Sequence, residues 1–193
     1  MALKQVVVIA GPSGSGKNAV IDGIIARSPH CERLVTATTR APREGEVNGV
    51  DYHFLSREEF DRALEKGDIL EHRYVESLGT HYGVYKPDLD SRLALGGVIL
   101  AHLDIIGARY LKRNYDATTF FIMPDSFEHL EERVRGRNKE MTEAEIAKRM
   151  EIARREIAEH APEYDYRIVN ENGKLDETVA KVVEILKKEG YTL

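Results

Sequence analysis

The sequence has a single cysteine, Cys31, among its 193 residues. One cysteine excludes an internal disulfide and suits a reducing environment, so we expect a cytoplasmic protein. Apolar runs are short, and none approaches the roughly 18 residues of a membrane-spanning helix. The first four residues lead straight into an apolar strand and leave no room for a signal peptide. These absences predict a soluble protein with no membrane partner.

Basic residues are not in excess either. Lys plus Arg is 28 and Asp plus Glu is 33, which gives a net charge of −5. Nucleic-acid binders usually carry a basic surplus, so we expect no nucleic-acid partner and only local cationic sites. The seven histidines show no metal-ligand spacing, and no serine or cysteine lies in a nucleophile motif. Phosphoryl transfer, which needs neither kind of motif, stays open.

The most informative stretch is residues 5–25, which read QVVVIA, then GPSGSGKN, then AVIDGII. The apolar run at 6–9 is typical of a strand buried on both faces of a parallel sheet. The glycines permit a tight loop whose N–H groups converge on an anion at the start of a helix. A phosphate-binding loop is predicted, and the alternative is a glycine-rich turn without a ligand. The candidate residues are Gly11, Pro12, Ser13, Gly14, Ser15, Gly16, Lys17 and Asn18, with Lys17 at the β- and γ-phosphates.

The last position of the pattern G-x-x-x-x-G-K-[ST] is Asn18 rather than Ser or Thr. The hydroxyl that is missing here normally holds Mg²⁺. An amide oxygen can also ligate a hard cation, so Asn18 is the candidate metal ligand.

Strand and helix patterns alternate along the chain, which predicts a three-layer α/β/α fold with a parallel sheet. We expect this core to comprise residues 1–33 and 85–193, because residues 34–84 read as a small mixed β insert. Within the insert, the alternation at 50–54 predicts a half-exposed strand, and 34–40 is rich in β-forming residues. A polar break near 136–148 predicts a lid, and a capping box at Thr142 and Glu145 opens a long helix that includes Ile157.

A second anion site is indicated by Arg40 and Arg43, which lie three residues apart in a proline-containing turn, with Tyr52 following. Two guanidinium groups suit bidentate capture of a phosphate, and a tyrosine hydroxyl can complete the contact. The alternative is a pair of solvated loop arginines.

Two acidic residues, Glu71 and Asp104, lie within or at the end of otherwise apolar predicted strands. An unpaired carboxylate there costs several kcal/mol, so each needs a partner. The N1–H and N2–H₂ groups of guanine could supply a forked pair of donors, whereas adenine has an acceptor at N1. The alternative is an internal salt bridge.

Basic residues gather around the polar break. Arg133, Arg137 and Arg149 are candidates for neutralising charge during phosphoryl transfer from a hinged segment. For Arg135, Lys148, Arg154 and Arg155, we favour solvated helix faces with ion pairs to nearby glutamates such as Glu131.

The chain closely resembles guanylate kinases in the order and spacing of six stretches. The most specific is TTRAPREGEVNGVDYHF, because this block is typical of the GMP-binding insert of that family. The stretches are GPSGSGK (11–17), TTRAPREGEVNGVDYHF (38–54), LEH (70–72), HYG (81–83), LDIIGAR (103–109) and RGRN (135–138).

This resemblance implies a P-loop NTPase core, a GMP-binding domain and a lid, and the reaction ATP + GMP → ADP + GDP with Mg²⁺. It implies that Arg40, Arg43, Tyr52 and Tyr82 hold the GMP phosphate. It also implies that Thr36, Glu71 and Asp104 meet the base, that Asn170 contacts the ATP side, and that Lys17, Arg133, Arg137 and Arg149 stabilise the moving phosphoryl group.

Some positions depart from the family pattern. Asn18 affects the metal site, and His102 replaces an aspartate near it. Val84 replaces a hydroxyl residue that donates to guanine O6, and Ile106 replaces a polar residue. Two alternatives therefore stay open: a guanylate-kinase-like binding module with weak or no catalysis, and a kinase for another phosphorylated acceptor such as a sugar phosphate.

Overall fold

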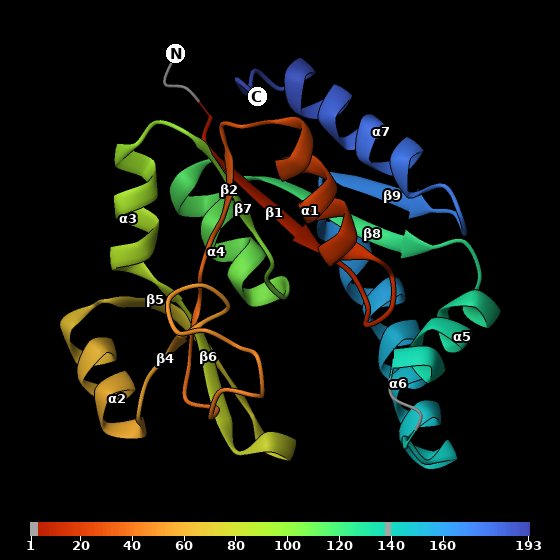
Figure 1. The fold of residues 1–193 in the computed structure, drawn as a ribbon, viewed down its shortest axis with the longest axis horizontal. Helices are drawn as coiled ribbons and strands as arrows, with labels where there is room; N and C mark the ends of the chain where they lie inside the picture. The colour runs from red at the N-terminus through yellow and green to blue at the C-terminus, as the bar shows by residue number, and fades with distance from the viewer. Residues whose placement is uncertain (1–3, 138–139) are drawn as a thin grey trace.

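Two separate β-sheets organise the chain in the computed structural model, which describes residues 4–137 and 140–193 (Figure 1). The larger sheet has the strand order β2-β7-β1-β8-β9, and all of its neighbouring strands run parallel. Its strands are β1 (Val6–Ala10), β2 (Cys31–Arg33), β7 (Val98–Ala101), β8 (Thr118–Pro124) and β9 (Tyr166–Asn170).

Helices cover both faces of this sheet. Val7 and Ile9 of β1 pack with α1 (Lys17–Arg27) and α7 (Leu175–Lys188) on one face. Val6 and Val8 point to the other face, where α3 (Lys86–Ala94) and α4 (Ile105–Tyr115) contribute Leu89 and Leu111. A strand buried on both faces explains the unbroken apolar run. The predicted three-layer α/β/α fold with a parallel sheet is confirmed.

The smaller sheet has the order β4-β3-β6-β5 and lies below the core in Figure 1. β3 runs parallel to β4, whereas β6 runs antiparallel to both β3 and β5, so the sheet is mixed as predicted. Phe60 of the helix α2 packs on this sheet, and Ser56 and Glu59 form a reciprocal capping box at the start of α2. The elements are β3 (Ala37–Thr38), β4 (His53–Phe54), α2 (Arg57–Lys66), β5 (Ile69–Val75), the short 3-10 helix η1 (Glu76–Leu78) and β6 (Thr80–Tyr85).

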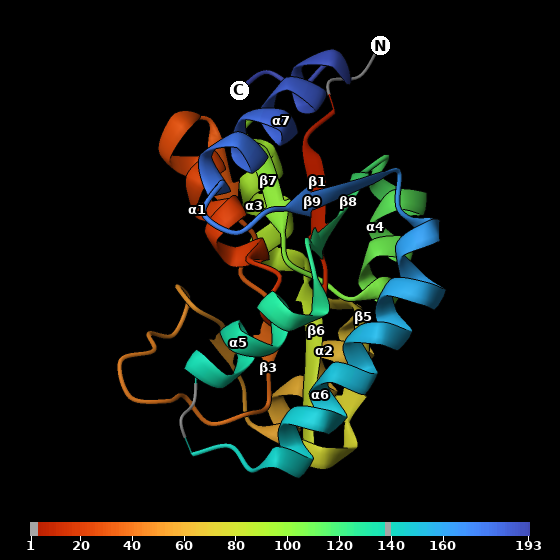
Figure 2. The same ribbon diagram turned by 90° about the vertical axis from the view of Figure 1, so that its right-hand side faces the viewer.

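A third group of elements extends from the end of the core sheet that also carries the smaller sheet (Figures 1 and 2). In Figure 1 this group lies at the lower right and the smaller sheet at the lower left. The third group comprises α5 (Phe127–Arg137), α6 (Glu143–Arg155), the π-helical turn η2 (Glu156–His160) and the 3-10 turn η3 (Ala161–Glu163). Leu130, Ile146 and Met150 form its own small core, and Thr142 caps α6 with Glu145 as predicted. The predicted lid at 136–148 includes residues 138 and 139, which lie outside the described residues.

Several predicted boundaries were wrong. The proposed strand at 50–54 is a turn up to Asp51, because the Val50 and Asp51 N–H groups bind the Val47 carbonyl, and Val50 is 63% exposed. The β-rich stretch 34–40 contributes only the two residues of β3. The polar edge strand β2 was not predicted. The long helix from 142 changes to π-helical geometry at Glu156.

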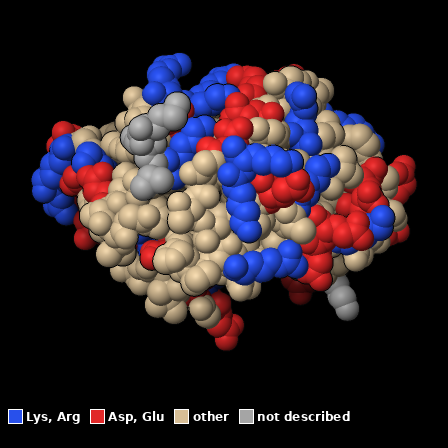
Figure 3. Space-filling model, turned by 90° about the horizontal axis from the view of Figure 1, so that it is seen from above, with Lys and Arg blue, Asp and Glu red and all other residues tan. Residues whose placement is uncertain are grey.

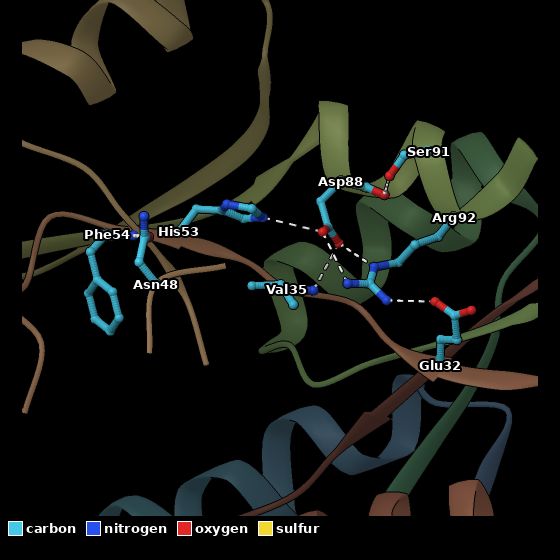
Figure 4. Close-up of polar contacts among 8 residues, drawn as sticks. All are labelled: Glu32, Val35, Asn48, His53, Phe54, Asp88, Ser91 and Arg92. Atoms are coloured by element: carbon cyan, nitrogen blue, oxygen red, sulfur yellow. Dashed lines mark hydrogen bonds and ion pairs between the residues drawn. The ribbon is translucent and has the colours of Figure 1, made fainter. Parts of the chain in front are cut away.

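Asp88 ties the smaller sheet to the core (Figure 4). Its carboxylate accepts hydrogen bonds from the Val35 N–H at 3.0 Å, and it pairs with His53 Nε2 at 3.2 Å and with Arg92 Nε at 2.7 Å. Arg92 also pairs with Glu32 of β2 at 2.7 Å. Because His53 lies on β4 and Asp88 on α3, this network links the two sheets at the point where the chain passes between them.

On the face drawn in Figure 3, charges of both signs are mixed, with Lys and Arg side chains interspersed with Asp and Glu. Examples of surface pairs are Arg27–Asp176 at 2.6 Å and Lys4–Glu189 at 3.0 Å, and such exposed pairs contribute about 0–1 kcal/mol each. Within residues 4–137 and 140–193, no helix has both the length and the apolar character that crossing a membrane requires.

Candidate nucleotide site

The site lies at the carboxyl ends of the parallel strands. β1 is flanked by β7 on one side and β8 on the other, so the direction of winding reverses there. In open α/β sheets, ligands bind in the crevice outside such a reversal point. The loop after β1, residues 102–104 after β7, and Asn170 at the end of β9 all meet at this edge.

The loop after β1 has the backbone that its glycines allow. Gly11 and Gly16 have φ values of +144° and +89°, which residues other than glycine rarely adopt. A Cβ at Gly11 would overlap the carbonyl oxygen of Ile122, and one at Gly16 would overlap the side-chain amide of Asn170. These positions therefore need glycine for both backbone conformation and space.

Lys17 begins α1 and bends back over the loop. Its Nζ donates a hydrogen bond to the Pro12 carbonyl at 3.2 Å. Gly16 at the N-cap offers no side-chain acceptor to the first N–H groups of α1. Unsatisfied N–H groups and the helix dipole at such a terminus favour an anion, and Lys17 adds a positive charge beside it.

Asn170, the last residue of the edge strand β9, forms a hydrogen bond to this loop. Its Nδ2 donates to the Ser15 carbonyl at 2.9 Å, and its Oδ1 accepts from the Thr178 hydroxyl at 3.0 Å. The resemblance implied that Asn170 contacts ATP, but the residue is only 5% exposed and both ends of its amide are used. Its contacts in the structure are those of a residue that supports the loop from behind.

Asn18 follows Lys17 on the first turn of α1. Its Oδ1 is buried and has no hydrogen-bond partner among the described residues. A buried amide oxygen without a partner fits a hard cation such as Mg²⁺, which usually has few protein ligands and is completed by phosphates and water. The described residues contain no cluster of three or more His, Cys, Asp or Glu that could hold a metal by itself.

A first cavity of about 310 Å³ joins the phosphate loop to the predicted base site. Eight candidate residues from the sequence, Gly11, Ser13, Lys17, Thr36, Tyr52, Glu71, Tyr82 and Asp104, line it. The structure therefore brings together residues from the core and from the smaller sheet that are up to 93 positions apart, from Gly11 to Asp104.

A second, larger cavity of about 1310 Å³ adjoins the first. It lies between the smaller sheet and the α5–α6 group, because Arg40 and Arg43 line one side and Met141 and Arg149 the other. The two cavities share Ser13, Tyr52, Tyr82 and His102. Lys17 and the predicted arginine pair thus face adjoining parts of one opening.

Arg40 holds an acidic partner in this structure. Its Nη1 and Nη2 donate to the two carboxylate oxygens of Glu46, each at 2.9 Å, and Glu46 also accepts the Arg43 N–H at 2.7 Å. The hydrogen bonds from Arg40 are the largest of the effects that lower the pKa of Glu46 to about 2. The sequence reasoning did not single out Glu46, although its spacing of three and six residues from the two arginines was a usable signal.

Glu71 is half-buried and lines the first cavity. Burial, followed by the negative charge of Asp104, raises its pKa to about 7. Asp104 is not at the end of a strand as predicted but caps α4, where its Oδ1 accepts the Ile106 and Gly107 N–H groups at 3.0 and 3.2 Å. Its Oδ2 pairs with Arg73 at 3.1 Å, so the salt bridge left open as the alternative for this residue exists, although the Arg73 side chain is exposed rather than internal.

Four further polar residues of the first cavity were not predicted from the sequence, namely Arg73 and three that follow α6. Glu156 and His160 come from the π-helical turn η2, and Tyr164 follows η3. Burial raises the pKa of Glu156 and of Tyr164, the latter also through the charge of Asp104. π-helical turns are frequent at functional sites, but no sequence pattern distinguishes this one from the end of α6.

The basic residues singled out around the polar break have different contacts in the structure. Arg149 donates to the Ser13 hydroxyl at 3.5 Å and so reaches the phosphate loop from α6. Arg133 instead donates to Asn172 Oδ1 at 3.2 Å. The side chain of Arg137 lies outside what the structure describes. Arg135 pairs with Glu131 at 2.7 Å, as expected for a solvated helix face.

Comparison with known proteins identifies the family. The family model of guanylate kinase matches residues 3–189. This chain belongs to the guanylate kinase family. It is 38% identical to a guanylate kinase of Synechocystis over 96% of this chain and 94% of that protein, and 41% identical to one of Thermosynechococcus vestitus over 87% and 86%. The crystal structure of guanylate kinase from Anaplasma phagocytophilum matches with a TM-score of 0.73 at 31% identity, covering 100% of this chain and 89% of that one.

The departures from the guanylate kinase pattern have clear positions in the structure. His102 lies at the end of β7 and lines both cavities. Val84, on β6, is fully buried in the apolar cluster that includes Leu34 and Leu89, so its side chain contributes packing and no hydrogen-bond donor. Ile106 is 46% exposed on the first turn of α4.

Proposed function

We propose that this member of the guanylate kinase family transfers the γ-phosphoryl group of ATP to GMP, giving ADP and GDP. The observation that carries the proposal is the joined pair of cavities. Lys17 of a phosphate loop and Glu71 line one cavity, Arg40 and Arg43 line the other, and both include Tyr52. We therefore place the site for a nucleotide phosphate, an acceptor for guanine and a site for a second phosphate in one opening.

In the proposed reaction an oxygen of the GMP phosphate attacks the γ-phosphorus in line, and the bond to the β–γ bridging oxygen of ATP breaks. No protein nucleophile is needed. Lys17 and Arg149 would bind the oxygens of the transferring group, and the contacts of Lys17 with Pro12 and of Arg149 with Ser13 support this role. We assign the same role to Arg133 and Arg137 after closure of the α5–α6 group.

For ATP, we propose that the loop residues Gly11 to Lys17 bind the phosphates through their N–H groups, with Asn170 supporting the loop. Asn18 would hold Mg²⁺ through Oδ1, the buried oxygen without a partner. When bound, Mg²⁺ would neutralise part of the phosphate charge and orient the phosphates.

For GMP, we propose that Arg40, Arg43, Tyr52 and Tyr82 bind the phosphate. The bidentate Arg40–Glu46 pair supports this role, because a guanidinium fork that fits a carboxylate also fits a phosphate. Glu71, with Thr36 and Asp104, would meet the base, since an ionised carboxylate accepts from N1–H and N2–H₂ of guanine but meets an acceptor in adenine.

We also propose the division into a core of residues 1–33 and 85–193, a GMP-binding insert of residues 34–84, and a lid near 136–148. Two separate sheets and a larger cavity between the smaller sheet and the α5–α6 group support this division. We place the protein in the cytoplasm, with GMP and ATP as its small-molecule partners.

The test is a coupled assay of ADP formation with ATP, Mg²⁺ and a panel of monophosphates. We expect GMP to react at least tenfold faster than AMP or IMP. Equal rates would reject the guanine assignment. A sugar phosphate that outperforms GMP would establish a different acceptor. Calorimetric binding of GMP without binding of ATP and Mg²⁺ would establish a binding module instead of an enzyme.

A further inference from the structure

Arg73 enters the first cavity from the same strand as Glu71. The two residues lie two positions apart on β5, and Glu71, Arg73 and Val75 all line the cavity. The pairing of β5 with β6 is irregular between Ile69 and His72, so it is the shared lining of one cavity, rather than strand alternation, that places Glu71 and Arg73 on the same side. The intervening residue, His72, packs toward α2 instead, with its ring centroid 6.1 Å from that of Phe60.

Asp104 holds Arg73 in place. The Arg73 Nη1 donates to Asp104 Oδ2 at 3.1 Å, while Asp104 Oδ1 accepts the Ile106 and Gly107 N–H groups. The carboxylate is therefore fixed by the start of α4. An arginine side chain has five N–H donors in a planar fork, and the pair with Asp104 engages Nη1, so the fork can also serve a ligand in the cavity.

Guanine needs both acceptors and donors around it. Its N1–H and N2–H₂ groups are donors that a carboxylate such as Glu71 can accept, whereas O6 and N7 are acceptors on the adjacent edge. Arginine binding to O6 and N7 together is the commonest specific contact to guanine. Val84 is fully buried and apolar, so that position of β6 supplies no donor.

We propose that Arg73 is a specificity-determining residue that donates to O6 and N7 of guanine, while Glu71 accepts from N1–H and N2–H₂. Two nearby side chains of one strand, both lining the first cavity, would then contact two edges of the base. Asp104, which lies near the proposed base site, would act here as a positioning residue through its Oδ2, because that oxygen orients the guanidinium. The inference rests on the proposed function and names how that site selects its base.

The experiment compares substrates that lack one acceptor each. 7-Deaza-GMP has no N7 acceptor, and 6-thio-GMP has sulfur in place of O6, yet both keep N1–H and N2–H₂. We expect the wild-type protein to prefer GMP over each by about tenfold in kcat/KM. In Arg73→Ala the ratio of kcat/KM for GMP to kcat/KM for each analogue should fall to about one. Arg73→Lys keeps the charge but lacks the fork, so the ratio for 7-deaza-GMP should also approach one.

Two controls separate base reading from other roles. IMP lacks the N2 amino group, so the GMP/IMP ratio should stay the same in Arg73→Ala. Arg62→Ala removes an exposed arginine of α2 from the same part of the chain, and should leave every ratio unchanged. A thermal melt of each variant shows that it is folded.

Three results would overturn the inference. An equal loss of kcat/KM for GMP and both analogues in Arg73→Ala would show that Arg73 only balances the cavity carboxylates. A collapse of the 6-thio-GMP ratio in Thr36→Val but not in Arg73→Ala would assign O6 to the Thr36 hydroxyl. A wild-type protein that does not prefer GMP over either analogue would show that no contact to O6 or N7 contributes to selectivity.

Failure of the proposed function is distinguishable from failure of this inference. The same ratios can be measured as dissociation constants by calorimetry. Binding of GMP without turnover would reject phosphoryl transfer, and the ratios of dissociation constants for the Arg73 variants would still decide the contact. Turnover of GMP with unchanged ratios would reject the contact alone.

Discussion

Asn170 and Ser15, separated by 155 positions in the sequence, are joined by a hydrogen bond of 2.9 Å from the Asn170 amide to the Ser15 carbonyl. The last strand of the core sheet thereby holds the loop that follows the first strand. Thr178 of α7 orients the same amide by donating to its oxygen at 3.0 Å. The shape of the phosphate loop therefore depends on residues near the C-terminus as well as on its own glycines.

Asn170→Ala should weaken ATP binding more than GMP binding, because the support lies behind the ATP loop. We expect KM for ATP to rise about tenfold, and the free energy of unfolding to fall by roughly 1–3 kcal/mol since the Ser15 carbonyl and the Thr178 hydroxyl lose a partner. Steady-state kinetics and urea denaturation measure the two effects. Asn114→Ala, an exposed amide of α4, is the control. An equal rise in both KM values would contradict the assignment.

Asn18→Leu removes the buried oxygen proposed for Mg²⁺ while keeping a similar volume. The concentration of Mg²⁺ that gives half-maximal activity should rise about tenfold, whereas Asn18→Ser should keep or improve the wild-type value because it retains a short oxygen ligand. Without nucleotide, Asn18→Leu should stabilise the protein by about 1 kcal/mol, since a buried polar atom without a partner is lost. Unchanged Mg²⁺ dependence together with unchanged stability would show that this oxygen has no metal role.

Glu71 should make GMP binding depend on pH near neutrality, because burial beside Asp104 raises its pKa to about 7. A protonated carboxyl cannot accept from both N1–H and N2–H₂, so kcat/KM for GMP should fall about tenfold per pH unit below 7. Glu71→Gln should lack this limb and retain only the ionisation of the GMP phosphate near pH 6. Identical pH profiles of the two proteins would refute the role.

The same carboxyl should lower stability at high pH. The folded protein holds this proton up to about pH 7, whereas the ordinary pKa is 4.5, so the free energy of unfolding should fall as pH rises through that window. Glu71→Gln removes the buried charge and should be more stable than the wild type at pH 8, by about 1–3 kcal/mol, and nearly equal at pH 4. Urea denaturation at both pH values checks the sign.

Asp88→Asn should loosen the link between the two sheets. Burial alone would raise the pKa of Asp88, but hydrogen bonds from His53, Arg92 and the Val35 N–H together lower it to about 2, against an ordinary 3.8. The stabilisation is therefore present above pH 3.8 and is lost as pH falls toward 2. We expect a loss of roughly 1–3 kcal/mol at pH 7 and a higher KM for GMP.

A matched control for that substitution lies on the same helix. Asp90→Asn removes an exposed carboxylate that pairs with Lys86, and such pairs contribute less than about 1 kcal/mol. Denaturation at pH 7 and at pH 3 should show that the difference between wild type and Asp88→Asn shrinks in acid. A difference that stays constant would mean that the charge of Asp88 is not what holds the link.

Local patterns in the sequence predicted much of the architecture. The apolar run of β1, the glycine loop and the capping boxes at Ser56 and Thr142 each depend on residues within a few positions of one another. Such patterns can be recognised from the sequence alone, because strand alternation and helix caps involve residues that are near neighbours in the chain. The parallel three-layer fold followed from their order along the sequence.

Only the tertiary structure decided what several of the candidate side chains contact. Asp104 caps a helix and holds Arg73, Asn170 supports a loop rather than facing the cavity, and Glu46 occupies the Arg40 fork. The polar β2 forms an edge strand because it pairs with β7, 67 positions later at Cys31 and Val98. Sequence periodicity says which face of an element is apolar, but not which distant element meets its polar side chains. That choice is made when the sheets and helices pack.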